Sequence, residues 1–122
     1  MILVDTSVWI DHFHKPIPAL AEALERGDVL IHPFVIGELA CGQLARRHEV
    51  LSLLSTLPQT GQATDDETLL FIDRHLLMGK GLGYIDVHLL ASVVITDEAR
   101  IWTTDKQLGV IARHLGVAMA GT

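Results

Sequence analysis

With 122 residues, the chain is the size of one domain, so we expect a single domain spanning residues 1–122. Apolar residues make up 49% of the chain, yet no uninterrupted apolar run approaches the ~18 residues of a membrane span. Asp5 interrupts the N-terminal apolar run that could otherwise serve as a signal peptide. We therefore expect a soluble, cytoplasmic protein with no membrane association. The net charge of −6 argues against a nucleic-acid partner unless several acids converge on bound cations.

The first half of the chain alternates short apolar runs with helical patterns. Apolar residues recur at helical spacing up to Gly27, a usual helix terminator, while Gly37 and Gly42 weaken the helical pattern that follows. The predicted elements are a strand at 2–4, a turn at 5–7, helices at 8–14 and 17–24, a strand at 29–31, and mostly helical structure from 33 to 57 with a second helix at 50–54.

The second half continues this alternation. Thr64 and Glu67 fit a capping box, which marks the start of a helix and explains the local acids. The apolar segment that follows the glycine-rich loop predicts a buried helix. The predicted elements are a strand or loop at 57–63, a helix from 64 to 77–79, a loop at 79–86, a helix at 86–95, a strand at 100–103, a helix from 105 to 115, and a short last strand at 117–119.

Strands that alternate with helices through short links indicate an α/β fold with a mainly parallel central sheet and helices on both faces. Such sheets bind ligands at the carboxyl ends of their strands. Asp5 and Asp105 each follow a predicted strand and begin the next helix. These two carboxylates are therefore expected at one edge of the sheet.

Two further acids lie in apolar helical segments. Glu38 and Asp86 have apolar neighbours and no Lys or Arg three or four residues away, so their burial would require another counter-charge. Carboxylates suit Mg²⁺ or Mn²⁺, and a cluster of them can activate water for phosphodiester cleavage. Taken singly, Asp5, Asp86 and Asp105 are explained as well by helix capping, and Glu38 by an exposed position beside Gly37.

The residues next to these acids yield weaker predictions. Ser7 and Thr104 are expected to support the acidic site, with Thr104 preferred to Thr103 because it lies nearer the strand end. The single cysteine, Cys41, is expected to be a small buried side chain, and His88 to be packed or exposed and not a ligand. Candidate cations for holding a nucleic-acid backbone are Arg46, Arg47, Lys80, Lys106 and Arg113.

Four blocks of the chain, in this order, are similar to a known family: DTSVWID, GELACG, GYIDVHLLAS and WTTDKQL. They resemble the PIN-domain ribonucleases, and specifically the VapC toxins of bacterial toxin–antitoxin pairs. The resemblance implies that Asp5, Glu38, Asp86 and Asp105 bind Mg²⁺ or Mn²⁺ and cleave RNA endonucleolytically. It also implies a homodimer that is inhibited by a VapB-like antitoxin, in a larger complex with it.

Three other classes remain as alternatives. An aspartate-nucleophile phosphatase would carry a second acid two residues after the first, where this chain has Ser7. A phospho-acceptor receiver domain needs a pair of acids after the first strand and another after the third, and neither is evident. A binding module without catalytic activity would need no group of four acids.

Overall fold

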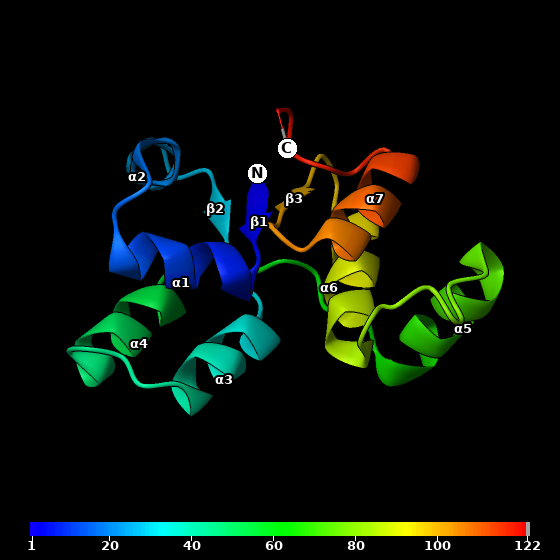
Figure 1. Cartoon of the computed structure of the whole chain (residues 1–122), viewed down its shortest axis with the longest axis horizontal. Helices are drawn as coiled ribbons and strands as arrows, with labels where there is room; N and C mark the ends of the chain where they lie inside the picture. Colours follow the sequence, from blue (N-terminus) through cyan, green and yellow to red (C-terminus); the bar gives the residue numbers. More distant parts are fainter. Residues whose placement is uncertain (122) are drawn as a thin grey trace.

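A three-stranded parallel sheet lies at the centre of the computed structural model, which describes residues 1–121 (Figure 1). The strands are β1 (Ile2–Val4), β2 (Val29–Leu30) and β3 (Arg100–Trp102), in the order β2–β1–β3. In register, Leu3 of β1 lies opposite Leu30 of β2 and Ile101 of β3. Because all three strands run the same way, their carboxyl ends meet at one edge, as predicted.

Helices surround this sheet on both faces, which confirms the α/β class. They are α1 (Thr6–His14), α2 (Pro18–Glu25), α3 (Pro33–Cys41), α4 (Arg47–Ser55), α5 (Asp65–His75), α6 (Tyr84–Val94) and α7 (Lys106–His114). Figure 1 shows α1 to α4 gathered around the β2 side of the sheet and α5 to α7 around the β3 side. The candidate active site lies where these two groups of helices meet, at the carboxyl edge of the sheet.

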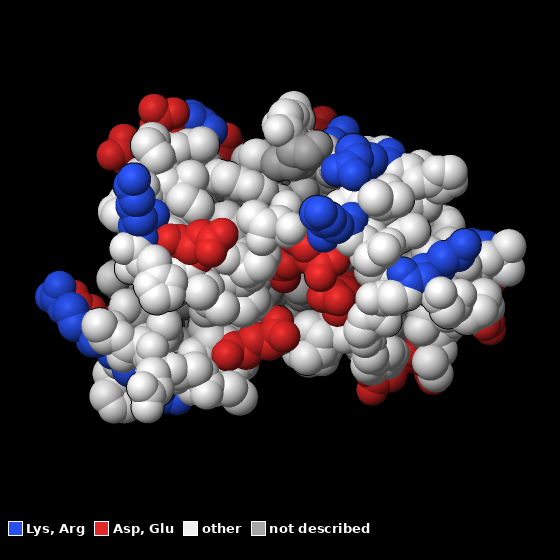
Figure 2. All heavy atoms as spheres, in the orientation of Figure 1, with Lys and Arg blue, Asp and Glu red and all other residues white. Residues whose placement is uncertain are grey.

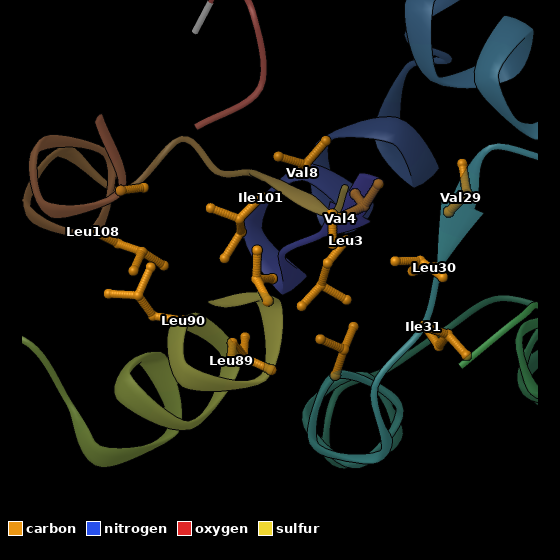
Figure 3. Close-up of a cluster of buried hydrophobic side chains, with 14 of the residues drawn as sticks. Leu3, Val4, Val8, Val29, Leu30, Ile31, Leu89, Leu90, Ile101 and Leu108 are labelled. Atoms are coloured by element: carbon orange, nitrogen blue, oxygen red, sulfur yellow. The ribbon is translucent and has the colours of Figure 1, made fainter. Parts of the chain in front are cut away.

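The buried apolar side chains form a continuous core through the sheet. In Figure 3, Val8 of α1 lies on one side of the strands, and Leu89 and Leu90 of α6 lie on the other. Val8, Leu89 and Leu90 are fully buried. The apolar sequence of α6 predicts a buried helix, and the structure explains it: the helix is covered by the sheet, α5 and α7.

Several elements differ from the predictions in their bounds or extent. Helix α1 begins at Thr6, two residues early, because Asp5 caps it. Helix α5 ends at His75, and Leu76 follows in the left-handed conformation (φ 54°). The expected last strand is a single bridge between Ile101 and Ala118, and segment 57–63 contributes only a bridge between residues 31 and 59.

Cys41 is exposed, so its predicted burial is wrong. It is the last residue of α3, two positions beyond the buried Leu39, and this offset turns it away from the core. Among residues 1–121, no helix has the length and apolar character that crossing a membrane requires.

Candidate active site

The four predicted acids come from four separate elements that meet at the carboxyl edge of the sheet. Asp5 follows β1, Glu38 lies on α3, Asp86 lies in the first turn of α6, and Asp105 precedes α7. Figure 2 shows acidic side chains gathered in a hollow near the middle of the molecule, between the α1–α3 part and the α6–α7 part. The fold thus brings these carboxylates into one electrostatic neighbourhood.

Asp5 is the most enclosed of the four, with 6% of its surface exposed. Its Oδ1 accepts a hydrogen bond from the backbone N–H of Thr6 at 2.8 Å, which makes it the N-cap of α1. Its Oδ2 accepts from the hydroxyls of Thr103 at 2.7 Å and Ser7 at 3.2 Å. Three donors hold this carboxylate in one orientation, so capping and a role in the site are compatible.

Glu38 is exposed, so of the two alternatives for this residue the structure contains the exposed position beside Gly37 and not the burial that its apolar neighbours suggested. It directly precedes the buried Leu39, but its own side chain points to the hollow, where its Oε1 accepts a hydrogen bond from the Thr6 hydroxyl at 2.7 Å. Thr6 therefore links the first two acids: its N–H binds Asp5 and its hydroxyl binds Glu38.

Asp86 lies one turn into α6, which begins at Tyr84 and has Gly83 as its N-cap. Its Oδ2 accepts a hydrogen bond from the backbone N–H of Gly83 at 3.2 Å. Partial burial raises the pKa of the Asp86 carboxyl above its usual range, the Gly83 hydrogen bond lowers it, and the negative charges of Asp5, Asp105 and Glu38 raise it further. Asp86 therefore lies within electrostatic range of the other three acids.

Asp105 caps α7, because its Oδ1 accepts a hydrogen bond from the backbone N–H of Leu108 at 2.9 Å. The Thr103 hydroxyl links it to Asp5, since this oxygen accepts from the Asp105 N–H at 3.0 Å while it donates to Asp5. Ser7, which was predicted to support the acids, donates its hydroxyl hydrogen bond to Asp5. Thr104 contributes its backbone N–H to Ser7 Oγ at 3.3 Å, so the hydroxyl that reaches the acids is that of Thr103 and not that of Thr104.

The donor set fits a hard divalent cation. Every candidate ligand is a carboxylate oxygen, and Glu38, Asp86 and Asp105 each keep one oxygen that accepts no hydrogen bond from residues 1–121. The four carboxylates are spaced more widely than the ligands of a complete coordination shell. Within the described residues no group of three His, Cys, Asp or Glu side chains is arranged to hold a metal ion. The arrangement is thus an acidic hollow with free oxygens around its rim.

Buried polar contacts support the two helices that carry Glu38 and Asp86. His32 caps α3: its Nδ1 accepts a hydrogen bond from the Phe34 N–H, so Nε2 carries the proton that faces Ser92 of α6 at 3.2 Å. Burial, helped by the nearby His88, lowers the pKa of His32 to about 4, which keeps it neutral near pH 7. His88, which is also buried, lies 2.8 Å from Asp65 of α5.

The sequence does not predict the contacts that Asp65 makes with His88 and Tyr84. It explains Asp65 only as a first-turn acid of α5, whereas in the structure Asp65 also accepts a hydrogen bond from the Tyr84 hydroxyl at 2.9 Å. The short segment from Tyr84 to His88 therefore attaches α6 to α5 on both sides of Asp86. A buried histidine after an acid in an apolar helix was the available signal, because a buried imidazole needs a hydrogen-bond partner.

Comparisons with known proteins agree with this fold. The PIN domain family model matches residues 2–114, so this chain belongs to the PIN domain family. Within that family the chain is similar to Ribonuclease VapC32 of Mycobacterium tuberculosis, in the strains CDC 1551 / Oshkosh and ATCC 25618 / H37Rv. Each relative is 46% identical over 120 residues, which cover 98% of this chain and 97% of the relative. The resemblance indicated by the four sequence blocks is confirmed.

Proposed function

We propose that this chain is an endoribonuclease that requires Mg²⁺ or Mn²⁺ and acts as the toxin of a toxin–antitoxin pair. The observation that carries the proposal is the convergence of four carboxylates from separate elements at one edge of the sheet, and the charges of the other three acids contribute, after burial, to the raised pKa of Asp86. The near full-length similarity to Ribonuclease VapC32 supports ribonuclease chemistry at this site. A capping role alone does not explain why Glu38, which caps nothing, faces the same hollow.

In the proposed mechanism the chain's own residues hold charge and orient the cut. Asp5 is fixed by three hydrogen-bond donors and provides the rigid anchor of the site. Glu38, Asp86 and Asp105, each with one oxygen that accepts no hydrogen bond from residues 1–121, would hold the cation together with Asp5, and the cation would relieve their mutual repulsion. When bound, a divalent cation would supply Lewis-acid stabilisation of the charge that develops on the scissile phosphate and would lower the pKa of the attacking water.

The proposed partners are RNA, a VapB-like antitoxin and a second copy of the chain, in the cytoplasm. Exposed apolar side chains on α5 and at the end of α6 support the proposal that another chain covers this surface. They are Leu69, Leu70, Val94 and Ile95, and each is between 43% and 57% exposed. A homodimer that buries them, and a larger complex with the antitoxin, would remove this surface from water.

The proposal is tested by incubating the purified protein, free of antitoxin, with total cellular RNA and mapping new 5′ ends. We expect cuts at a few positions in the presence of Mg²⁺ or Mn²⁺ and none after chelation, because the acids alone repel the phosphate backbone. A folded protein that binds Mn²⁺ and cuts no RNA would contradict ribonuclease activity and favour a binding module. Cuts that persist in excess chelator would contradict the metal requirement.

Replacing the Thr103 hydroxyl tests how the anchor carboxylate is held. We expect Thr103→Val, which keeps the shape of the side chain, to lower RNA cleavage by about 10- to 100-fold, as for other residues that orient metal ligands. Thr104→Val is the matched control and should retain near-parental activity, because only its backbone N–H is used. Cleavage rates at saturating Mn²⁺ and the Mn²⁺ affinity from calorimetry make the comparison. Equal activity of both variants would contradict the assigned contact.

A further inference from the structure

A cavity of about 800 Å³ lies between the C-terminal end of α5, the glycine-rich loop and α7. Its polar rim consists of His75 of α5, Lys80 of the loop, and Arg113 and His114 of α7, and none of its lining residues is acidic. The last turn of any helix favours basic residues, which accounts for three of the four. Lys80 belongs to no helix, so helix polarity does not explain its presence.

The loop carries Lys80 to this cavity through a specific backbone path. Gly79 and Gly81, on either side of it, adopt φ angles of 69° and 81°, which other residues rarely adopt. Gly81 also packs against Gln107 of α7, since a Cβ at this glycine would lie 3.5 Å from Gln107 Cγ. The loop is thus held against α7, and Lys80 faces the same cavity as Arg113.

These cations are free in a protein with a net charge of −6. Two other arginines form ion pairs: Arg26 pairs with Asp28 at 3.3 Å and Arg46 with Glu49 at 3.0 Å. Neither Lys80 nor Arg113 forms an ion pair with any residue in 1–121. The side chains keep their charge available for an external anion.

The cavity and the acidic hollow each include residues of α7 or its N-cap. Asp105 caps the start of this helix, and Arg113 lies eight residues later, about 12 Å along the axis at 1.5 Å per residue. The Arg113 side chain runs back over Gly109: a Cβ there would lie 3.3 Å from Arg113 Nη1 and 4.0 Å from Thr103 Cγ2. Figure 2 shows basic side chains on the α5–α7 part of the face, beside the acidic hollow.

We infer that the cavity formed by His75, Lys80, Arg113 and His114 binds backbone phosphates of the RNA strand whose cleavage the proposed function assigns to the acidic hollow. Arginine and lysine bind phosphate oxygens through charge-assisted hydrogen bonds, and the imidazoles add N–H donors. The inference rests on the proposed function, and it gives the acidic protein a cationic path for its substrate next to the acids. Of the five candidate cations, it selects Lys80 and Arg113.

The test compares two double variants with the same loss of charge: Lys80→Ala/Arg113→Ala at the cavity, and Lys15→Ala/Arg26→Ala on the α1–α2 side. All four side chains are exposed, so both proteins should fold. The probe is an oligonucleotide containing a site that the parent protein cuts. Binding is measured in the Asp5→Asn background, and cleavage in the otherwise unaltered chain, at several salt concentrations.

We expect the cavity variant to bind the RNA about 10- to 100-fold more weakly. Its salt slope should fall by about 1.4, since each phosphate contact to a single strand contributes about 0.7. Mn²⁺ binding by calorimetry should not change, and Lys80→Arg/Arg113→Lys should restore affinity. The control pair should bind and cut like the parent.

Two results would overturn the inference while the proposed function stands. One is a cavity variant that cuts and binds RNA like the parent, with the same salt slope. The other uses poly-glutamate as a second probe: a cavity variant that binds poly-glutamate more weakly than the parent does, but binds RNA equally well, would assign the cavity to an acidic polypeptide. A parent protein that cuts no RNA at all would instead remove the proposed function.

Discussion

Asp5→Asn should abolish RNA cleavage, with a loss of at least about 100-fold, and leave the fold intact. The loss follows because stabilisation of the developing phosphate charge by a bound cation is worth several kcal/mol, and each 1.36 kcal/mol changes the rate tenfold. The fold should survive because asparagine caps a helix as well as aspartate does, so the bond from the Thr6 N–H to residue 5 is kept.

The matched control for this substitution is Asp11→Asn, which makes the same charge change at an exposed position of the same helix. Cleavage of the mapped RNA site and growth of cells that express each variant are the readouts, with thermal unfolding as the test of folding. A fully active Asp5→Asn protein would contradict the role of the acidic hollow. An inactive Asp11→Asn protein would show that the loss is not specific to the site.

The sheet and most helices could be predicted from sequence because their signals are local. Three short apolar runs separated by helical patterns define a parallel sheet, and Thr64 with Glu67 marks the start of α5 through a capping box that the structure contains. The sequence could not show that residues 31 and 59, and residues 101 and 118, form single bridges and not strands, because a single paired residue leaves no periodic pattern.

The acids could be predicted as a group, but not their surroundings. Glu38 has apolar neighbours in sequence, and burial was inferred from them; on a helix, adjacent residues face different directions, so a buried Leu39 says little about Glu38. The start of α6 was placed late because glycine-rich residues predict a loop, whereas Gly83 serves as the N-cap, a position that glycine fills well.

The choice between Thr103 and Thr104 shows the same limit. Both threonines follow β3, and only the way β3 leaves the sheet turns the first hydroxyl to Asp5 and the second residue's N–H to Ser7. Contacts of this kind join residues nearly a hundred positions apart, and one sequence carries no signal for such a pairing. The cavity of Lys80 and Arg113 also depends on packing between segments that are distant in sequence, since these two residues are 33 positions apart.

Asp86→Asn should make the metal-free protein more stable and at the same time remove most of its stabilisation by Mn²⁺. The pKa of Asp86 is raised in the folded state, first by burial and also by the charges of Asp5, Asp105 and Glu38. The folded protein therefore binds more protons than the unfolded chain just above the usual aspartate pKa. The contribution of Asp86 to stability is therefore complete below the unfolded-state pKa and is lost as the pH rises through the folded-state pKa.

The asparagine variant lacks this titration and can still accept the Gly83 N–H bond. The difference in unfolding temperature between Asp86→Asn and the parent, measured in chelator, should therefore grow in favour of the variant as the pH rises above about 4. Asp97→Asn, which removes the same charge from an exposed position, serves as the control for the loss of a charge in itself.

Added Mn²⁺ should reverse the order of the two proteins. At a concentration of about 100 times Kd, a ligand that binds only the folded state stabilises it by about 2.7 kcal/mol, which corresponds to roughly 10 °C in a chain of this size. The parent should gain this increment and Asp86→Asn only a small part of it, since the variant lacks one donor and one charge. Equal stabilisation of both proteins would remove Asp86 from the metal site. A variant that loses several kcal/mol in chelator would show instead that the carboxylate is needed to hold the first turn of α6.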